Sequence, residues 1–164
     1  MKILVFSDSH SYTSEMSRVL RKTKGVDVVA FCGDGHKDLS QMQQKYPDKL
    51  YLAVKGNCDW YCDFAALQTI TLCGKKLLLT HGHYQYVKQD LHHLLSLGHQ
   101  EQADIILFGH THHQLTTVEE GILLVNPGSI GYDNCYSLID IDEPTGRIVV
   151  TEYPDNQFGP VIVN

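Results

Sequence analysis

Short apolar runs alternate with amphipathic segments along the first two thirds of the chain. The apolar runs predict strands at Lys2–Phe6, Val26–Cys32, Leu50–Val54, Thr69–Leu72, Lys76–Thr80 and Ile105–Phe108. Apolar residues at helical spacing predict helices over Ser11–Lys24, Asp38–Tyr46 and Gln85–Leu97. Val26–Cys32 is apolar except at Asp27, and such a run is typical of a strand covered on both faces.

The pattern changes after Ile105–Phe108, where strands follow one another without helices. They are predicted at Leu115–Val118, Ile122–Asn126, Tyr136–Asp142 and Arg147–Tyr153. Alternating strands and helices followed by a meander predict an α/β fold with two packed sheets and helices outside. The length of 164 residues suits one domain, and we expect residues 1–164 to form it.

Composition and charge narrow the class of protein. No apolar stretch reaches the roughly 20 residues that a membrane helix needs, and Met1 and Lys2 lead directly into a strand without room for a signal peptide. We therefore expect a soluble cytoplasmic protein with no membrane partner. The net charge of −6 argues against a nucleic-acid partner, because such binding depends on neutralising phosphates. The five cysteines are predicted to be reduced thiols, mostly buried.

Side chains that can bind metals follow five of the predicted strands. In chain order they are Asp8, His10, Asp34, Asn57, His81, His110 and His112. Because functional groups gather beyond the carboxyl ends of strands in α/β sheets, these residues are predicted to converge on one crevice. A set of carboxylate, imidazole and amide groups suits Mn²⁺, Fe or Zn²⁺ better than Ca²⁺. Seven side chains exceed the needs of one four-ligand site and fit two ions.

These blocks resemble the signature of a known family. Asp8-x-His10, Gly33-Asp34, Gly56-Asn57, His81 and Gly109-His110-x-His112 are similar to the five motifs of the calcineurin-like metallophosphoesterase superfamily. The short length, Gly56-Asn57-Cys58-Asp59, His81-Gly82-His83 and Asn126-Pro127-Gly128-Ser129 resemble its small bacterial and archaeal phosphodiesterase branch. The resemblance implies a four-layer α/β/β/α sandwich of two mixed sheets flanked by helices.

The resemblance also assigns roles to these side chains. It implies that one divalent ion is held by Asp8, His10 and His112, and a second by Asn57, His81 and His110, with Asp34 bridging the two. Mn²⁺ is the metal it favours, with Ni²⁺, Zn²⁺, Fe and Mg²⁺ left open. The mechanism it implies is hydrolysis of a small phosphodiester by a hydroxide that bridges the two ions. Asp34 and Asn57 would thereby serve catalysis as well as metal binding.

One position departs from the wider family. Cys58 stands where most members have a histidine that binds the phosphate and protonates the leaving group. A thiol has an ordinary pKa of about 8.5 and no cationic form, so it cannot stabilise developing charge as imidazolium does. His83 is the first candidate for contact with the phosphate or leaving group, and His36 is the second. The identity of the general acid, and with it the catalytic role of Cys58, stays open.

Several further residues are expected around or away from the crevice. Asn126 and Ser129 are predicted at its rim, and the side chains that set substrate choice are predicted near Tyr12, Trp60, Tyr84 and Tyr132. For Trp60, Tyr61 and Phe64, packing in the core is favoured over an apolar wall for a substrate or a dimer. The histidines expected to be exposed or to face away from the metals are His92, His93, His99 and His113.

Two other functions fit the same fold. A metal-binding protein-interaction scaffold, like the retromer subunit of this fold, would have a compromised metal site, whereas here every expected ligand is present. A phosphomonoesterase or protein phosphatase is usually larger and carries the histidine that Cys58 replaces. The sequence therefore predicts a phosphodiesterase and leaves its physiological substrate and a homo-oligomeric state open.

Overall fold

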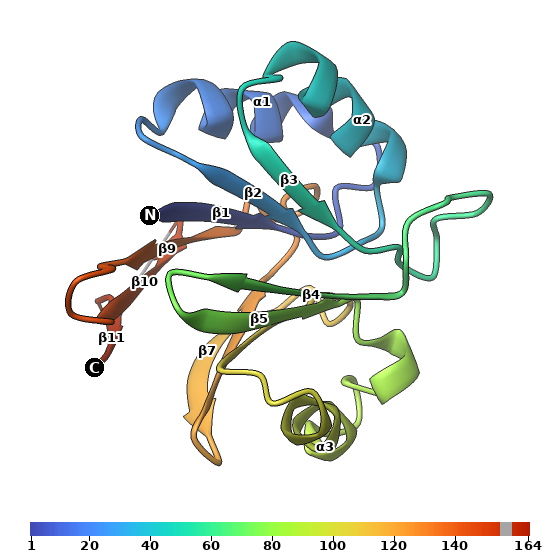
Figure 1. Cartoon of the computed structure of the whole chain (residues 1–164). Helices are drawn as coiled ribbons and strands as arrows, with labels where there is room; N and C mark the ends of the chain where they lie inside the picture. Colours follow the sequence, from blue (N-terminus) through green and yellow to red (C-terminus); the bar gives the residue numbers. More distant parts are fainter. Residues whose placement is uncertain (155–158) are drawn as a thin grey trace.

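Two mixed β-sheets face each other in the computed structural model, which describes residues 1–154 and 159–164 (Figure 1). In spatial order, the first sheet consists of β11 (Val161–Val163), β10 (Ile148–Tyr153), β9 (Tyr136–Ile141), β1 (Lys2–Phe6), β2 (Val28–Phe31) and β3 (Leu50–Ala53). The second consists of β4 (Leu67–Leu72), β5 (Lys75–Thr80), β6 (Ile105–Leu107), β8 (Ile122–Pro127) and β7 (Gln114–Glu119). The strands β1, β2 and β3 are parallel, as are β5, β6 and β8.

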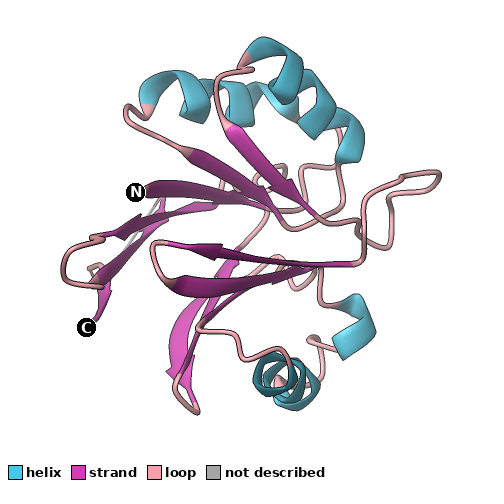
Figure 2. Ribbon diagram, viewed as in Figure 1, coloured by secondary structure: helices cyan, strands magenta, loops and turns pink. Residues whose placement is uncertain are grey.

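Helices cover the outer face of each sheet (Figure 2). They are α1 (Thr13–Lys22) and α2 (His36–Lys45) on the first sheet, and α3 (His92–Gln100) with the short 3₁₀ helix η1 (His83–Gln85) beside the second. The order of layers is therefore α/β/β/α, and the predicted fold class is confirmed. No helix in the described part of the chain is long and apolar enough to cross a membrane.

The alternation of side chains along the strands explains these layers. In β1, Ile3 and Val5 belong to the core between the sheets, whereas Leu4 and Phe6 pack with residues of α1 and α2. In β5, Leu78 packs instead with Leu94 of α3. Because both faces of these strands are covered, Ile3–Phe6 in β1 and Leu77–Leu79 in β5 are apolar at consecutive positions rather than at every second one.

The helix predicted over Gln85–Leu97 is wrong in its first half. Tyr86 has a left-handed backbone (φ 54°), and the N–H of Val87 donates to the carbonyl of Gly82 at 3.3 Å, which closes a turn before α3 starts. Val87 is nevertheless buried, so the apolar stripe is real but spans a turn and a helix. Gly98 does not end α3: it is buried, and a Cβ there would lie 2.6 Å from Cδ1 of Ile106.

The burial predicted for the cysteines is wrong, whereas the exposure predicted for the histidines of α3 is confirmed. All five cysteines are free thiols, but only Cys32 is buried, so the prediction that most are buried is wrong. The reason is that the others lie in loops or turns outside the strand cores, as Cys73 does between β4 and β5. The histidines predicted to be exposed are all exposed, namely His92, His93, His99 and His113.

Candidate metal centre

The predicted metal ligands lie in loops that follow β1, β2, β3, β5 and β6, and so come from both sheets. They are Asp8 and His10, Asp34, Asn57, His81, and His110 with His112. In each sheet the carboxyl ends of the parallel strands lie side by side. The loops that follow these ends in the two sheets meet, as the contact between Asp8 and His112 shows. The structure thereby brings together residues that are distant in the sequence.

One group of side chains forms around Asp8. Its Oδ1 lies 3.1 Å from Nε2 of His112 and 3.8 Å from Nε2 of His10. The two imidazole nitrogens are 3.4 Å apart. The ligand atoms of all three lie within 4.8 Å of one another, which is the spacing of groups that can share one cation.

A second group forms around His81. Its Nε2 lies 3.1 Å from Oδ1 of Asn57 and 3.4 Å from Oδ2 of Asp34. The ring of His110 is 5.0 Å from that of His81, centre to centre. Since Asp34 is also within reach of both Asp8 and His10, its carboxylate stands between the two groups.

A hydrogen bond from Nδ1 of His81 to the backbone determines which ring nitrogen faces the crevice. Nδ1 lies 2.7 Å from the carbonyl oxygen of Cys32, and because a carbonyl can only accept, Nδ1 donates. Nε2 is then the atom directed at Asp34 and Asn57. Ligating histidines are commonly oriented in this way by a donor bond from their other ring nitrogen.

The hydrogen bonds of the Asp8 carboxylate indicate whether a cation fits at this site. Asp8 is fully buried, and its Oδ2 accepts bonds from the Ser7 hydroxyl at 2.5 Å and from the His110 N–H at 3.1 Å. Its Oδ1 accepts no hydrogen bond from any residue that the structure describes, although it faces His10 and His112. A buried charged oxygen without a partner is strongly unfavourable, and a cation would satisfy it. The donor set therefore fits a divalent metal ion.

Burial and neighbouring charges shift the pKa values of three predicted ligands, and the shifts of Asp34 and His110 favour the deprotonated forms that bind a metal. Burial opposes charge on Asp34, but the hydrogen bond with His81 and the N–H of Cys58 hold the pKa of Asp34 well below its usual range. Burial also opposes charge on His81, but Asp34 and Asp8 raise its pKa overall. Burial and the neighbouring His81 lower the pKa of His110 to about 4, so its ring is neutral and has a free lone pair.

Glycines let the loops approach one another closely. A Cβ on Gly56 would collide with Oδ1 of Asp34, and one on Gly109 would collide with the Ser7 hydroxyl. At these two positions only glycine leaves room for the neighbouring carboxylate loop. The Gly-Asp, Gly-Asn and Gly-His pairs in the sequence thus mark close backbone approach.

Asp59, for which the sequence predicts no role, organises two of the loops. Its Oδ1 accepts the N–H groups of Gly35 and His36 at 2.8 and 2.9 Å and lies 3.0 Å from Nδ1 of His36. Its Oδ2 accepts the N–H groups of Asp34 and Gly56 at 2.8 and 2.9 Å. Its position two residues after Asn57 was the only signal in the sequence, because the direction of the carboxylate depends on the folded loop.

Asn126 and Ser129 do not lie at the rim of the crevice as predicted, because both are fully buried. The Asn126 amide donates to the carbonyl of Gly109 at 2.9 Å and to the Thr111 hydroxyl at 3.0 Å. The Ser129 hydroxyl donates to the carbonyl of Asp8 at 2.8 Å. These two residues therefore hold the loops that carry Asp8 and His110.

The candidates for contact with a phosphate occupy different settings. His83 is half-buried, and its Nδ1 is buried without a hydrogen-bond partner in the described part of the chain. Its ring lies 5.3 Å from that of His81 and 4.0 Å from that of Tyr84. Cys58 is exposed, and partial burial and the hydrogen bond to Asp34 raise the pKa of its thiol to about 11. His36 is held by Asp59 on the wall of a pocket.

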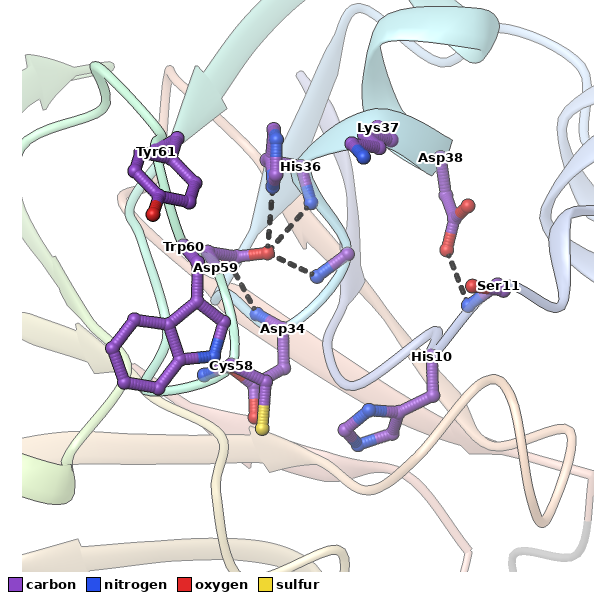
Figure 3. Close-up of a pocket in the computed structure, with 11 residues that line it drawn as sticks. His10, Ser11, Asp34, His36, Lys37, Asp38, Cys58, Asp59, Trp60 and Tyr61 are labelled. Carbon is purple, nitrogen blue, oxygen red and sulfur yellow. Dashed lines mark hydrogen bonds and ion pairs between the residues drawn. The ribbon is translucent and has the colours of Figure 1, made fainter.

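This pocket, of about 400 Å³, opens beside the metal centre (Figure 3). Its lining includes His10, Asp34 and Cys58 from the centre and Trp60 and Tyr61 from the next turn of the chain. Trp60 is 76% exposed and Tyr61 fully so, which shows that the expected core packing of both is wrong. The loop projects away from the sheets there, and only Phe64 returns to pack against the core.

Other aromatic side chains surround the centre on different sides. Tyr132 packs its ring 5.1 Å from that of His10 and 6.0 Å from that of Tyr12. Tyr12, Tyr84 and Tyr132 are all more than half exposed. The positions expected to shape substrate choice thus lie beside the predicted ligands.

A two-sheet α/β/β/α sandwich with a histidine and carboxylate crevice at its strand ends defines a metallophosphoesterase-like protein. A model of the calcineurin-like phosphoesterase superfamily domain matches residues 1–143, and the chain belongs to this superfamily. It is 36% identical over 132 residues to the probable metallophosphoesterase YsnB of Bacillus subtilis, covering 79% of this chain and 75% of YsnB.

One further protein is similar in sequence, and one solved structure is similar in fold. Phosphodiesterase YfcE of Escherichia coli is 28% identical over 170 residues, covering 87% of this chain and 89% of YfcE. The structure of Vps29 from Entamoeba histolytica in complex with zinc has a TM-score of 0.78 at 22% identity, covering 99% of this chain and 97% of Vps29. The resemblance to the superfamily and to its small microbial branch is therefore confirmed.

Proposed function

We propose that this protein is a phosphodiesterase that works with two divalent metal ions. The observation that carries the proposal is the buried Oδ1 of Asp8, which has no hydrogen-bond partner within residues 1–154 and 159–164 and faces Nε2 of His10 and of His112. A carboxylate oxygen in this setting is stabilised by a cation. Similarity to YfcE, which is named a phosphodiesterase, supports the class of reaction.

The side chains divide into two ligand sets that share one member. Asp8, His10 and His112 would hold one ion, Asn57, His81 and His110 would hold the other, and Asp34 would contact both. Bound divalent ions at such a site make water a nucleophile at neutral pH and neutralise the phosphate oxygens. Mn²⁺ is our first choice for this mixture of oxygen and nitrogen ligands, with Zn²⁺, Ni²⁺, Fe and Mg²⁺ as alternatives.

His83 is the residue we assign to the phosphate or the leaving group. Its buried Nδ1 has no partner among the described residues, and its ring is next to that of His81. Cys58 is a weak proton donor, because its thiol pKa is raised to about 11 by burial and by Asp34. Diesters whose leaving group departs without a proton are therefore expected to react fastest.

A protein-interaction scaffold of the same fold is the second candidate. Vps29, whose name refers to vacuolar protein sorting, has this fold, which makes the alternative concrete. The complete set of ligands around Asp8 and His81 favours an enzyme, because a scaffold has no need to keep a buried carboxylate without a partner. A phosphomonoesterase is less favoured, since Cys58 supplies no cationic group for a dianionic phosphate.

The test is a screen of substrates after removal of bound metal. Bis(4-nitrophenyl) phosphate, 4-nitrophenyl phosphate, cyclic nucleotides and dialkyl phosphates are compared with Mn²⁺, Ni²⁺, Zn²⁺ and Mg²⁺ added in turn. We expect metal-dependent cleavage of diesters, most rapid for aryl esters, and its loss in His112→Ala and Asp34→Asn with unchanged circular dichroism. Absence of turnover with every metal would favour the scaffold, and faster cleavage of monoesters would favour a phosphomonoesterase.

The free thiols of all five cysteines suit a reducing compartment, and we place the activity in the cytoplasm. The net charge of −6 favours a small phosphodiester over nucleic acid as the substrate.

A further inference from the structure

Two exposed aromatic side chains line one wall of the pocket beside the candidate metal centre. Trp60 is 76% exposed and Tyr61 is fully exposed, although both lie immediately after the loop that carries Asn57. Two adjacent aromatic rings that are open to water on the wall of a pocket offer a flat apolar surface to a ligand. The pocket's volume of about 400 Å³ lies in the range of small-molecule sites.

The loop that presents these rings is anchored from within. Asp59, which precedes Trp60, is 8% exposed and accepts two backbone N–H groups from the loop between β2 and α2, those of Asp34 and Gly35. The N–H of Trp60 itself donates to the carbonyl of Cys58 at 3.1 Å. Because the backbone is already fixed here, binding a ligand against the indole requires little additional ordering of the chain.

Two acidic side chains of the pocket, those of Asp38 and Asp59, are already bonded within the protein. Asp38 accepts the Ser9 hydroxyl at 2.6 Å and the Ser11 N–H at 2.8 Å, both through Oδ2. Asp59 is likewise taken by backbone donors, as described above. Trp60 offers an aromatic surface to a ligand, and exposed Lys37, which comes from α2 on the other side of the pocket, offers an ammonium group (Figure 3).

The pocket is continuous with the metal centre. His10, Asp34 and Cys58 contribute to its lining, so a group esterified to a phosphate at the metals would extend into it. A saturated alkyl group would gain little from a flat exposed indole, whereas a planar ring can stack on it.

We propose that this pocket is a substrate subsite that binds a planar aromatic group of the phosphodiester by stacking on Trp60. The inference rests on the proposed phosphodiesterase function and specifies its substrate class. The ring is either a small aryl group or a nucleobase, since both present the same flat π-surface.

Trp60 is the only tryptophan of the chain, so its fluorescence reports on the subsite directly. The Zn²⁺-loaded protein is titrated with methylphosphonate, with phenylphosphonate and with the methylene phosphonate analogue of AMP, none of which has a hydrolysable P–O ester bond. We expect at least one aromatic probe to quench the fluorescence and to bind about tenfold more tightly than methylphosphonate. The phenyl and adenine probes distinguish an aryl group from a nucleobase.

Variants connect the affinity to the indole. By calorimetry, Trp60→Ala is expected to lose about tenfold in affinity for the preferred aromatic probe and to keep its affinity for methylphosphonate. Trp60→Phe should retain most of the affinity. Tyr86→Ala is the matched control, because Tyr86 is 58% exposed but lies outside the pocket lining.

The outcomes separate this inference from the proposed function. If methylphosphonate binds and diesters are cleaved, but the rings add neither affinity nor quenching, the subsite is wrong and the phosphodiesterase stands. If aromatic probes bind through Trp60 but no ester is cleaved with any metal, the subsite stands without the activity. If Trp60→Ala weakens all three probes equally, the indole does not recognise the ring and the inference fails.

Discussion

Oδ1 of Asp8 lies 3.1 Å from Nε2 of His112, although Asp8 follows β1 in the first sheet and His112 follows β6 in the second. The carboxylate is fully buried, and its other oxygen is already bonded to Ser7 and to the His110 backbone. A cation between Asp8 and His112 would therefore connect the two sheets. Metal binding and the stability of the sandwich should be coupled for this reason.

Removal of metal is expected to lower thermal stability. A ligand that binds only the folded state stabilises it by about 2.7 kcal/mol at a free concentration of 100 times its Kd. Dialysis against EDTA should thus lower the Tm measured by calorimetry, and added Mn²⁺ or Zn²⁺ should restore it. His112→Ala should respond less to added metal. An equal Tm with and without chelator, in a sample shown to contain metal, would contradict the coupling.

Asp8→Asn should have opposite effects with and without metal. In EDTA the substitution removes a buried carboxylate whose Oδ1 has no hydrogen-bond partner in the described part of the chain, and we expect the free energy of unfolding in urea to rise by about 1 kcal/mol. With saturating Zn²⁺ the wild type should become the more stable protein, because only its carboxylate binds the ion well. A variant less stable than wild type in EDTA would mean that Oδ1 is satisfied without a cation.

Asp59→Asn is expected to destabilise the protein by about 3 kcal/mol and to weaken metal binding at least about tenfold. The amide would place N–H donors against the N–H groups that Asp59 now accepts, among them those of Asp34 and Gly56. Asp63→Asn is the control, because Asp63 is exposed nearby. The measurements are urea unfolding in EDTA and titration with Zn²⁺. Equal losses in both variants would show that the network of Asp59 is dispensable.

The effect of Asp59→Asn should depend on pH. Burial opposes charge on Asp59, but the backbone N–H groups of Gly56 and His36 outweigh it and lower its pKa. A carboxyl with a lowered pKa in the folded state stabilises that state fully above its unfolded pKa of about 3.9, and loses this contribution as pH falls through the folded value. The difference in unfolding free energy between wild type and variant should be constant near neutral pH and shrink below about pH 4. A difference independent of pH would exclude the charge as its source.

Cys58→His tests the missing general acid. An imidazole at this position can donate a proton to a leaving group, and such donors contribute about 10²–10⁴-fold to rate. We expect kcat to rise at least about tenfold for dialkyl phosphates and to change little for bis(4-nitrophenyl) phosphate, whose leaving group needs no proton. Cys58→Ser, which adds no acid, should leave the ratio of the two rates unaltered. If Cys58→His raises neither rate, proton donation is not what limits alkyl esters.

Strands were easier to predict than the helix before β6. Lys2–Phe6 was predicted with its observed bounds because both faces of β1 are covered, which leaves a continuous apolar run in the sequence. The stripe of Val87, Leu91 and Leu94 gave a helix that begins seven residues too early, at Gln85 instead of His92. Burial of Val87 depends on a turn around Gly82, and periodicity alone does not distinguish that turn from a helix.

The convergence of the ligand side chains could be predicted because each of them follows a strand. The residues that hold the ligand loops in place could not be predicted. The inward direction of Asp59 and the burial of Asn126 are set by loops whose path depends on contacts between distant segments. The exposure of Trp60 was missed for the opposite reason. An aromatic residue in a sequence indicates burial on average, and only the fold shows that the loop leads it away from the core.

Five of the seven predicted ligands have left-handed backbones, namely Asp8, His10, Asp34, His110 and His112, with φ between 45° and 68°. Non-glycine residues in this conformation are unfavourable by on the order of 1–3 kcal/mol each. Glycine or asparagine would suit these positions better for folding alone. Mutants selected only for thermal stability should therefore tend to lose the crevice residues. A screen for more thermostable variants must also measure activity, so that these residues are retained.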